Sequence, residues 1–136
     1  MKILKYIFII CYKLGVCLRK NICVFGGSVS GKNVENEKTA KLVGKIIAEN
    51  NLNIVFGGGE KGIMGAVAKS GIQNGTKTTG IIPNFLFNKD ILNTSHSKIF
   101  NTKLIKTKTM HKRKELMYEK SDGFLVLPGG IGTLDE

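Results

Sequence analysis

The stretch that most constrains the fold is an apolar run that leads into a glycine-rich turn. The run, Gly123 to Leu127, is typical of a buried strand, and Pro128 ends it because proline has no N–H for a sheet ladder. The glycines of the turn are Gly129, Gly130 and Gly132. They expose backbone N–H groups just before Thr133, a plausible helix cap, and such a turn cradles phosphate. The pattern predicts an anion site, with Glu136 placed to act on whatever carries the phosphate; the alternative is an ordinary capped turn.

Two earlier apolar runs end in glycine turns as well. Residues 21–25 lead into a turn over 26–28, and residues 53–56 lead into a turn over 57–62. Parallel strands place their carboxyl ends at one edge of a sheet, where ligands bind in open α/β folds. We therefore expect all three turns to converge on that edge.

The second of these turns matches the dinucleotide fingerprint G-x-G-x-x-G through Gly57, Gly59 and Gly62. A ribose-binding acid is expected about 20 residues further on. It is missing here, since Pro83 and Asn84 follow the next strand. The motif therefore indicates a Rossmann-like turn and disfavours NAD.

The first turn comes close to a Walker A loop, G-x-x-x-x-G-K-[ST]. Asn33 stands where that loop has its magnesium-binding hydroxyl, and an amide is a poor substitute for this ligand. A P-loop ATPase or kinase is therefore a minor alternative, which magnesium-dependent ATP binding would revive.

The alternation of apolar runs and helical periodicity predicts an α/β protein with a Rossmann-like, open, mostly parallel sheet and helices on both faces. The first helix shows an apolar stripe formed by Ala40, Val43, Ile46 and Ile47. The remaining predicted elements are helices over 33–50, 63–73 and 109–120, strands over 78–82 and within 98–107, and a loop over 83–97.

With 136 residues the chain is long enough for one domain. We expect a nucleotide-binding domain over 21–136 and an extension outside the core over 1–20. The extension is largely apolar, but Lys5 and Lys13 interrupt it and it is short for a membrane span. No small-x-small cleavage site follows it, so membrane association is the minority interpretation.

The net charge of +11 is of the kind that suggests an anionic partner. A basic group between Lys98 and Lys114 contains no acidic residue and precedes the last predicted strand. The sequence lacks the interleaved aromatic residues that single-stranded nucleic acid binders use. We therefore expect a small phosphorylated ligand and no nucleic acid.

The three cysteines, Cys11, Cys17 and Cys23, have neither C-x-x-C spacing nor nearby histidine partners. This spacing predicts neither a zinc site nor a disulfide framework. Cys23 lies in a predicted strand and is best interpreted as a small hydrophobe. A reducing, cytoplasmic location is the default expectation.

The predicted helix over 109–120 begins with a basic cluster, Met110-His111-Lys112-Arg113-Lys114, behind Thr109 as its cap. Helix N-termini favour anions, and the guanidinium of Arg113 is a planar fork that fits phosphate or carboxylate. The alternative is an ordinary surface arginine.

Three segments together resemble the Lonely Guy (LOG) family of cytokinin riboside 5′-monophosphate phosphoribohydrolases, which were often misnamed lysine decarboxylases. They are Phe56-Gly57-Gly58-Gly59 with Gly62-Ile63-Met64-Gly65, the Met110 to Lys114 cluster, and Pro128 to Glu136. The resemblance runs from about Ile22 to Glu136, and the pairing of M-H-x-R-K with P-G-G-x-G-T-x-x-E is its most specific part.

The resemblance implies hydrolysis of the N-glycosidic bond of AMP or of a cytokinin riboside 5′-monophosphate, by a homodimer or larger assembly that needs no metal or other cofactor. The resemblance implies catalytic roles for Arg113 and Glu136. Residue chemistry agrees, since a carboxylate can stabilise an oxocarbenium ion or activate water. Contacts to the nucleotide fall on Lys114, Gly129, Gly130, Ile131, Gly132, Thr133, Leu134, Asp135, Asp90, Gly26, Ser28, Gly58, Gly59 and Met110.

Two departures from the family pattern matter. The turn that begins at Gly26 differs from the C-G-S-S or G-S-R of many relatives, so the ribose or base side of the pocket can differ. Relatives also continue for several elements beyond the position of Glu136, which predicts a truncated, poorly active and unstable chain. A non-catalytic carrier of a nucleotide or of molybdenum cofactor, on the same fold, is the rival hypothesis.

Overall fold

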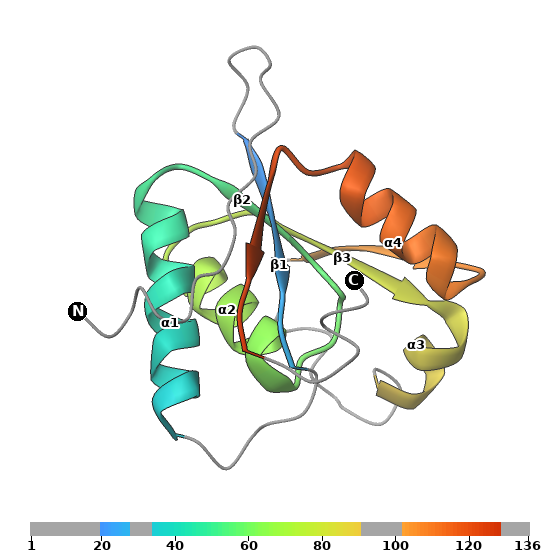
Figure 1. The fold of residues 1–136 in the computed structure, drawn as a ribbon, viewed down its shortest axis with the longest axis horizontal. Helices are drawn as coiled ribbons and strands as arrows, with labels where there is room; N and C mark the ends of the chain where they lie inside the picture. Colours follow the sequence, from blue (N-terminus) through green and yellow to red (C-terminus); the bar gives the residue numbers. More distant parts are fainter. Residues whose placement is uncertain (1–19, 28–33, 91–101, 129–136) are drawn as a thin grey trace.

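The computed structural model describes residues 20–27, 34–90 and 102–128 (Figure 1). The strands are β1 (Asn21–Phe25), β2 (Asn53–Phe56), β3 (Thr78–Pro83), β4 (Thr102–Thr107) and β5 (Gly123–Val126). The helices are α1 (Val34–Glu49), α2 (Gly62–Gln73), α3 (Asn84–Asp90) and α4 (Met110–Glu119).

Within the described residues the strands form one parallel sheet in the order β4-β3-β2-β1-β5. Strands β2 to β4 extend the sheet on one side of β1, and β5 pairs with the other side, with Ile22 opposite Gly123. The direction in which strands are added thus reverses at β1. In open α/β sheets, the crevice at such a reversal is where ligands bind.

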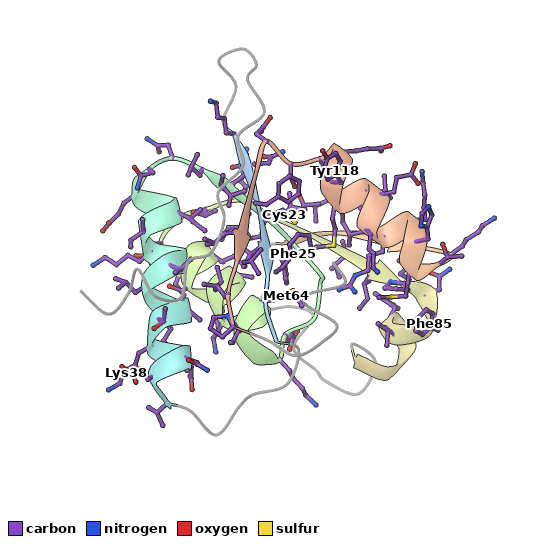
Figure 2. The ribbon with its side chains drawn as sticks, viewed as in Figure 1. Cys23, Phe25, Lys38, Met64, Phe85 and Tyr118 are labelled. Carbon is purple, nitrogen blue, oxygen red and sulfur yellow. The ribbon has the colours of Figure 1, made fainter. Side chains whose placement is uncertain are left out.

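Helices cover both faces of this sheet, as predicted (Figure 1). Successive side chains of a strand point to opposite faces, so each strand contributes side chains to two cores. Helices α1 and α2 bury the first core, whose members include Val24, Val43, Ile54, Val67 and Leu125. Helix α4 lies on the other face, and the buried residues of this second core are Cys23, Phe25, Val55, Ile81 and Met117. Figure 2 shows Cys23 and Phe25 in the interior, while Lys38 of α1 points away from the fold.

Helices α1 and α2 approach each other closely because small residues line their contact. A Cβ atom at Gly44 of α1 would overlap the backbone carbonyl oxygen of Val67 and lie 2.7 Å from the Cβ atom of Ser70. The hydroxyl of Ser70 also donates to the carbonyl oxygen of Lys41, at 2.5 Å. The first core is therefore closed by backbone-to-backbone contact rather than by large side chains alone.

The predicted fold class is confirmed, and so are the predicted strands and the three long helices, to within one or two residues at each end. Two details were wrong. The loop expected over 83–97 begins with helix α3, and Ile46, expected on the buried stripe of α1, is 45% exposed. The consecutive apolar residues of α3 show no helical period in seven residues, and Ile46 lies next to Ile47, which takes the core-facing position.

The predicted extension lies outside the described residues except for Lys20. In the part of the chain that the structure describes, no helix is both long and apolar enough to cross a membrane.

Candidate functional site

The ends of β1 and β5 and the start of α2 are joined by backbone hydrogen bonds at the carboxyl edge of the sheet. The N–H of Gly27 donates to the carbonyl oxygen of Pro128 at 3.2 Å, and the N–H of Ile63 donates to the carbonyl oxygen of Gly27 at 2.9 Å. The described parts of all three turns therefore lie at the predicted edge. They meet beside the reversal in strand order, between β1 and β5.

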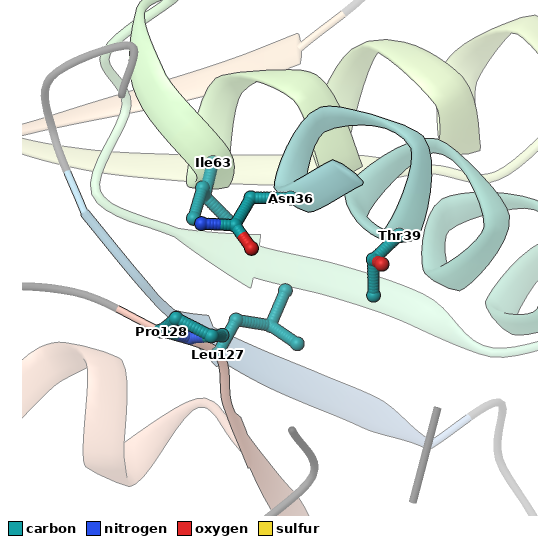
Figure 3. A pocket seen from close by; sticks show the side chains of 5 residues that line it. All are labelled: Asn36, Thr39, Ile63, Leu127 and Pro128. Carbon is teal, nitrogen blue, oxygen red and sulfur yellow. The ribbon is translucent and has the colours of Figure 1, made fainter. Parts of the chain in front are cut away.

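A narrow pocket, with no room for a water molecule, lies at this junction (Figure 3). Its lining comes from the first turns of α1, the start of α2 and the end of β5, namely Asn36, Thr39, Ile63, Leu127 and Pro128. Leu127 and Pro128 lead directly into the predicted phosphate turn in the sequence. Gly26 is in close contact with the same residues, since a Cβ atom there would lie 3.0 Å from Cγ2 of Ile63 and 3.6 Å from Cβ of Leu127.

Arg113 lies on the same edge, on the other face of the sheet. It is 7% exposed, so the prediction's alternative of an ordinary surface arginine is wrong. Its Nε donates to the carbonyl oxygen of Ile81 at 2.9 Å, and its Nη2 donates to that of Gly57 at 3.1 Å. A buried guanidinium is stable only when such partners satisfy it, and here the ends of β2 and β3 supply them.

Helix α4 places Arg113 through its own first turn. The hydroxyl of Thr109 accepts a hydrogen bond from the N–H of Lys112 at 3.1 Å, which confirms the predicted cap. The sulfur of Met110 lies 3.9 Å from Nη1 of Arg113. Met110 thus contacts the arginine, and the nucleotide contact that the resemblance implies for it stays a prediction.

The glycines after β2 have different surroundings. Gly58 is buried, with a φ of 81° and a Cβ position 3.2 Å from Cβ of Ile82. At Gly59 a Cβ atom would meet nothing within 4 Å. Gly59 is therefore the position of this turn that leaves space for a ligand, whereas Gly57 and Gly58 are in close contact with protein atoms.

Lys114 lines an aromatic hollow beside α4. The hollow has a volume of about 370 Å³ and is lined by Phe25, Lys114, Glu115, Tyr118 and Phe124. The rings of Phe25 and Phe124 stack with centroids 6.1 Å apart, and those of Tyr118 and Phe124 with centroids 5.2 Å apart. The structure thus separates Lys114 from its neighbour Arg113, which faces the ends of β2 and β3.

The exposed side of α4 carries one ion pair with a defined electrostatic effect. Nζ of Lys112 lies 2.8 Å from Oε2 of Glu115. This hydrogen bond raises the pKa of the lysine and lowers the pKa of the carboxyl. Both side chains are in solvent, so the pair contributes to the surface of the helix and not to the buried arginine.

Several predicted site residues lie outside the described residues. They are Ser28, Gly129, Gly130, Ile131, Gly132, Thr133, Leu134, Asp135 and Glu136. Asp90 is the last residue of α3, and only its backbone is described. In the described ranges, no group of three or more His, Cys, Asp or Glu residues could hold a metal ion.

Comparison with known proteins identifies the family. A family model described as "Possible lysine decarboxylase" matches residues 64–136, which is more than half of the chain. The chain is a member of the LOG family. Its LOG relatives include cytokinin riboside 5′-monophosphate phosphoribohydrolase LOG5 of Arabidopsis thaliana, with 38% identity over 86% of this chain and 49% of the relative. The probable enzyme LOGL9 of Oryza sativa subsp. japonica is 36% identical over 86% of this chain and 49% of its own length.

The chain spans about half the length of these LOG relatives. Solved structures share the fold at lower identity. The molybdenum cofactor carrier protein of Chlamydomonas reinhardtii aligns with a TM-score of 0.70 and 21% identity, over 88% of this chain and 68% of that one. The molybdenum cofactor binding protein of Rippkaea orientalis aligns with a TM-score of 0.68 and 22% identity, over 88% and 69% of the two chains.

Two partners of Arg113, Gly57 and Ile81, were missed as candidate site residues from the sequence. In the sequence Gly57 belongs to the dinucleotide-like turn and to a segment of the family resemblance, and neither marks it as a site residue. Its place at the carboxyl end of a strand was a usable signal, but nothing in the sequence marks the carbonyl of Ile81.

Proposed function

We propose that this LOG family member hydrolyses the N-glycosidic bond of a nucleoside 5′-monophosphate, either AMP or a cytokinin riboside 5′-monophosphate. The products are the free base and ribose 5-phosphate. The shared name of its relatives, at 36% to 38% identity, is the observation that carries the proposal. The buried Arg113, at the edge where the turns meet, supports it from the structure.

In the proposed reaction, water attacks C1′ of the ribose as the bond from C1′ to the base nitrogen breaks. The hydroxyl remains on ribose 5-phosphate, and the proton goes to the base. Positive charge develops on the ribose ring in the transition state, and the Glu136 carboxylate can stabilise this charge or activate the water. The glycine turn that follows Pro128 would bind the 5′-phosphate through its N–H groups.

Arg113 fits a role in holding the phosphate or orienting Glu136. Its guanidinium is fixed by Ile81 of β3, by Gly57 directly after β2 and by Met110 of α4, so little side-chain freedom remains to be lost when a ligand binds. A fixed positive charge at the ligand edge stabilises an anion more effectively than a mobile surface lysine does.

A carrier function is the second candidate, and the fold of the molybdenum cofactor carrier proteins favours it. A carrier would bind the nucleotide or cofactor without breaking a bond. The buried arginine and the open position at Gly59 are compatible with binding alone. The two candidates differ in Glu136, which has a catalytic role in the hydrolase and none in a carrier.

Three further expectations belong to this proposal. The family resemblance suggests a homodimer or larger assembly. The buried thiol of Cys23 fits a cytoplasmic location, and the strand that contains it supports a nucleotide-binding domain that begins near residue 21.

The deciding experiment follows the release of free base. The protein is incubated with AMP and with N6-isopentenyl-AMP, and the bases are separated by chromatography, for the natural protein, Glu136→Ala and the control Glu119→Ala. Glu119 is an exposed carboxylate at the far end of α4. Release that is lost only in Glu136→Ala supports the hydrolase, and the rates with the two substrates give its preference. Tight AMP binding without release supports the carrier, and neither binding nor release contradicts both.

A further inference from the structure

The position of Arg113 is determined by two groups far from it in the sequence and by one within its own helix. Its Nε donates to Ile81 and its Nη2 to Gly57, while Nη1 lies next to the sulfur of Met110. These contacts come from the end of β3, the residue after β2 and the first turn of α4. Two directed hydrogen bonds to a planar group define its plane as well as its place.

Gly57 contributes more than its carbonyl oxygen. A Cβ atom at this position would overlap Nη2 of Arg113, lie 3.1 Å from its Cζ and lie 3.4 Å from Cε of Met64. The guanidinium therefore occupies the space that a side chain at position 57 would fill. Arg113 can lie against the end of β2 only because residue 57 has no side chain.

The backbone does not need glycine at this position. The glycines with positive φ in the described residues are Gly58, Gly62 and Gly75, and Gly57 is not among them. An alanine at 57 would therefore be free of backbone strain. The atom that it meets is the far end of a flexible side chain, so the arginine would move and the strand would not.

We propose that Gly57 is a positioning residue that acts through Arg113, by leaving the space in which the guanidinium lies and by accepting its hydrogen bond. Only the expected effect of Gly57 on the reaction rate rests on the proposed function; the placement of Arg113 by Gly57 does not. In the dinucleotide fingerprint the first glycine of G-x-G-x-x-G permits the tight turn, whereas in this protein it leaves room for an arginine.

A cycle of three variants tests this: Gly57→Ala, Arg113→Ala and the double variant. Gly57→Ala should displace the guanidinium and lower kcat/KM for AMP by on the order of a hundredfold, as expected when a positioning group moves by about 1 Å. Arg113→Ala empties the space beside position 57, so adding Gly57→Ala to it should change neither rate nor Tm further. Independent effects that multiply in the double variant would overturn the proposal.

A second readout does not depend on activity. The Nε–H of Arg113 is buried and hydrogen-bonded, so it should give a protected resonance in ¹H–¹⁵N spectra, absent from Arg113→Ala. Gly57→Ala should shift this signal or expose it to solvent exchange. An unchanged signal together with an unchanged rate would refute the role of Gly57.

A matched control separates displacement of the arginine from loss of stability. Gly44→Ala places a methyl group against backbone on the other face of the sheet, so it should lower Tm while keeping the Arg113 signal. If Gly57→Ala alone fails to fold, a folded double variant would still confirm the steric relationship. A double variant that fails to fold although Arg113→Ala folds would show that the backbone needs the glycine, contrary to the proposal.

If the natural protein releases no base, the proposed function fails, but the Nε–H signal and the Tm cycle still decide whether Gly57 positions Arg113. Conversely, normal catalysis with no coupling between the two positions leaves the hydrolase intact and removes the role of Gly57.

Discussion

Asn21 and Asp122 bind each other twice at the amino-terminal edge of the sheet. The N–H of Asn21 donates to Oδ2 of Asp122, and the N–H of Asp122 donates to the carbonyl oxygen of Asn21, both at 2.8 Å. The pair joins the start of β1 to the residue before β5, across 101 positions of sequence. It fixes the register of the two strands whose other ends form the candidate site.

We expect Asp122→Ala to destabilise the protein by about 1–3 kcal/mol, because it removes a charged acceptor from a partly buried N–H group. Urea unfolding measures this loss. Asp122→Asn keeps an oxygen in the same place and should retain most of the stability. Equal stability of Asp122→Ala and the natural protein would show that water replaces the carboxylate at no cost.

Gly44→Ala should destabilise the protein although alanine is the better helix former. The helix propensity gains up to about 1 kcal/mol, whereas the added methyl group meets the backbone of Val67, and overpacking typically costs about 1–3 kcal/mol. Thermal and urea unfolding give the net change. Lys38→Ala, on the exposed side of the same helix, is the control and should be close to neutral. A more stable Gly44→Ala would mean that α1 and α2 separate easily.

Thr109→Ala should cost about 1 kcal/mol by removing the cap of α4. Thr109→Ser keeps the hydroxyl and should restore the stability. Because Arg113 lies in the first turn that this cap orders, hydrogen exchange of the Arg113 amide, which donates to the carbonyl oxygen of Thr109 at 3.2 Å, should accelerate in the alanine variant alone. Identical exchange in both variants would contradict this link.

Met117→Ala should cost about 2–5 kcal/mol, since Met117 is fully buried in the second core and its removal leaves a cavity. Met117→Leu conserves the volume and should cost less than about 1.5 kcal/mol. Unfolding by urea compares the two. Similar small losses for both would indicate that α4 moves inward to fill the space.

The sequence predicted the parts of the fold that depend on local patterns. The strand ends and the helix cap at Thr109 follow from apolar runs, glycines and capping chemistry within a few residues of each other. The face of a helix is predicted less well, as Ile46 shows, because Ile46 and Ile47 are adjacent and only Ile47 takes the core-facing position. The seven-residue helix α3 is too short for its period to appear.

The burial of Arg113 could not be predicted in this way. A charged residue in the first turn of a helix is exposed by default, and its partners Gly57 and Ile81 lie 56 and 32 positions away in the sequence. Only the folded arrangement of β2, β3 and α4 brings these carbonyl oxygens together. The chemistry of the arginine could be read from its type and its motif, but its position could not.

The order of the strands also sets the order in which the protein can be completed during synthesis. Strand β1 is made first, yet one of its two edges stays without its partner until β5 has been translated about a hundred residues later. Contacts this distant form slowly compared with local ones. A growing chain therefore holds an unpaired edge in the middle of its future sheet, and the crevice between β1 and β5 forms only when that edge is closed. Ligand binding at this crevice would accordingly report that the last described strand has docked.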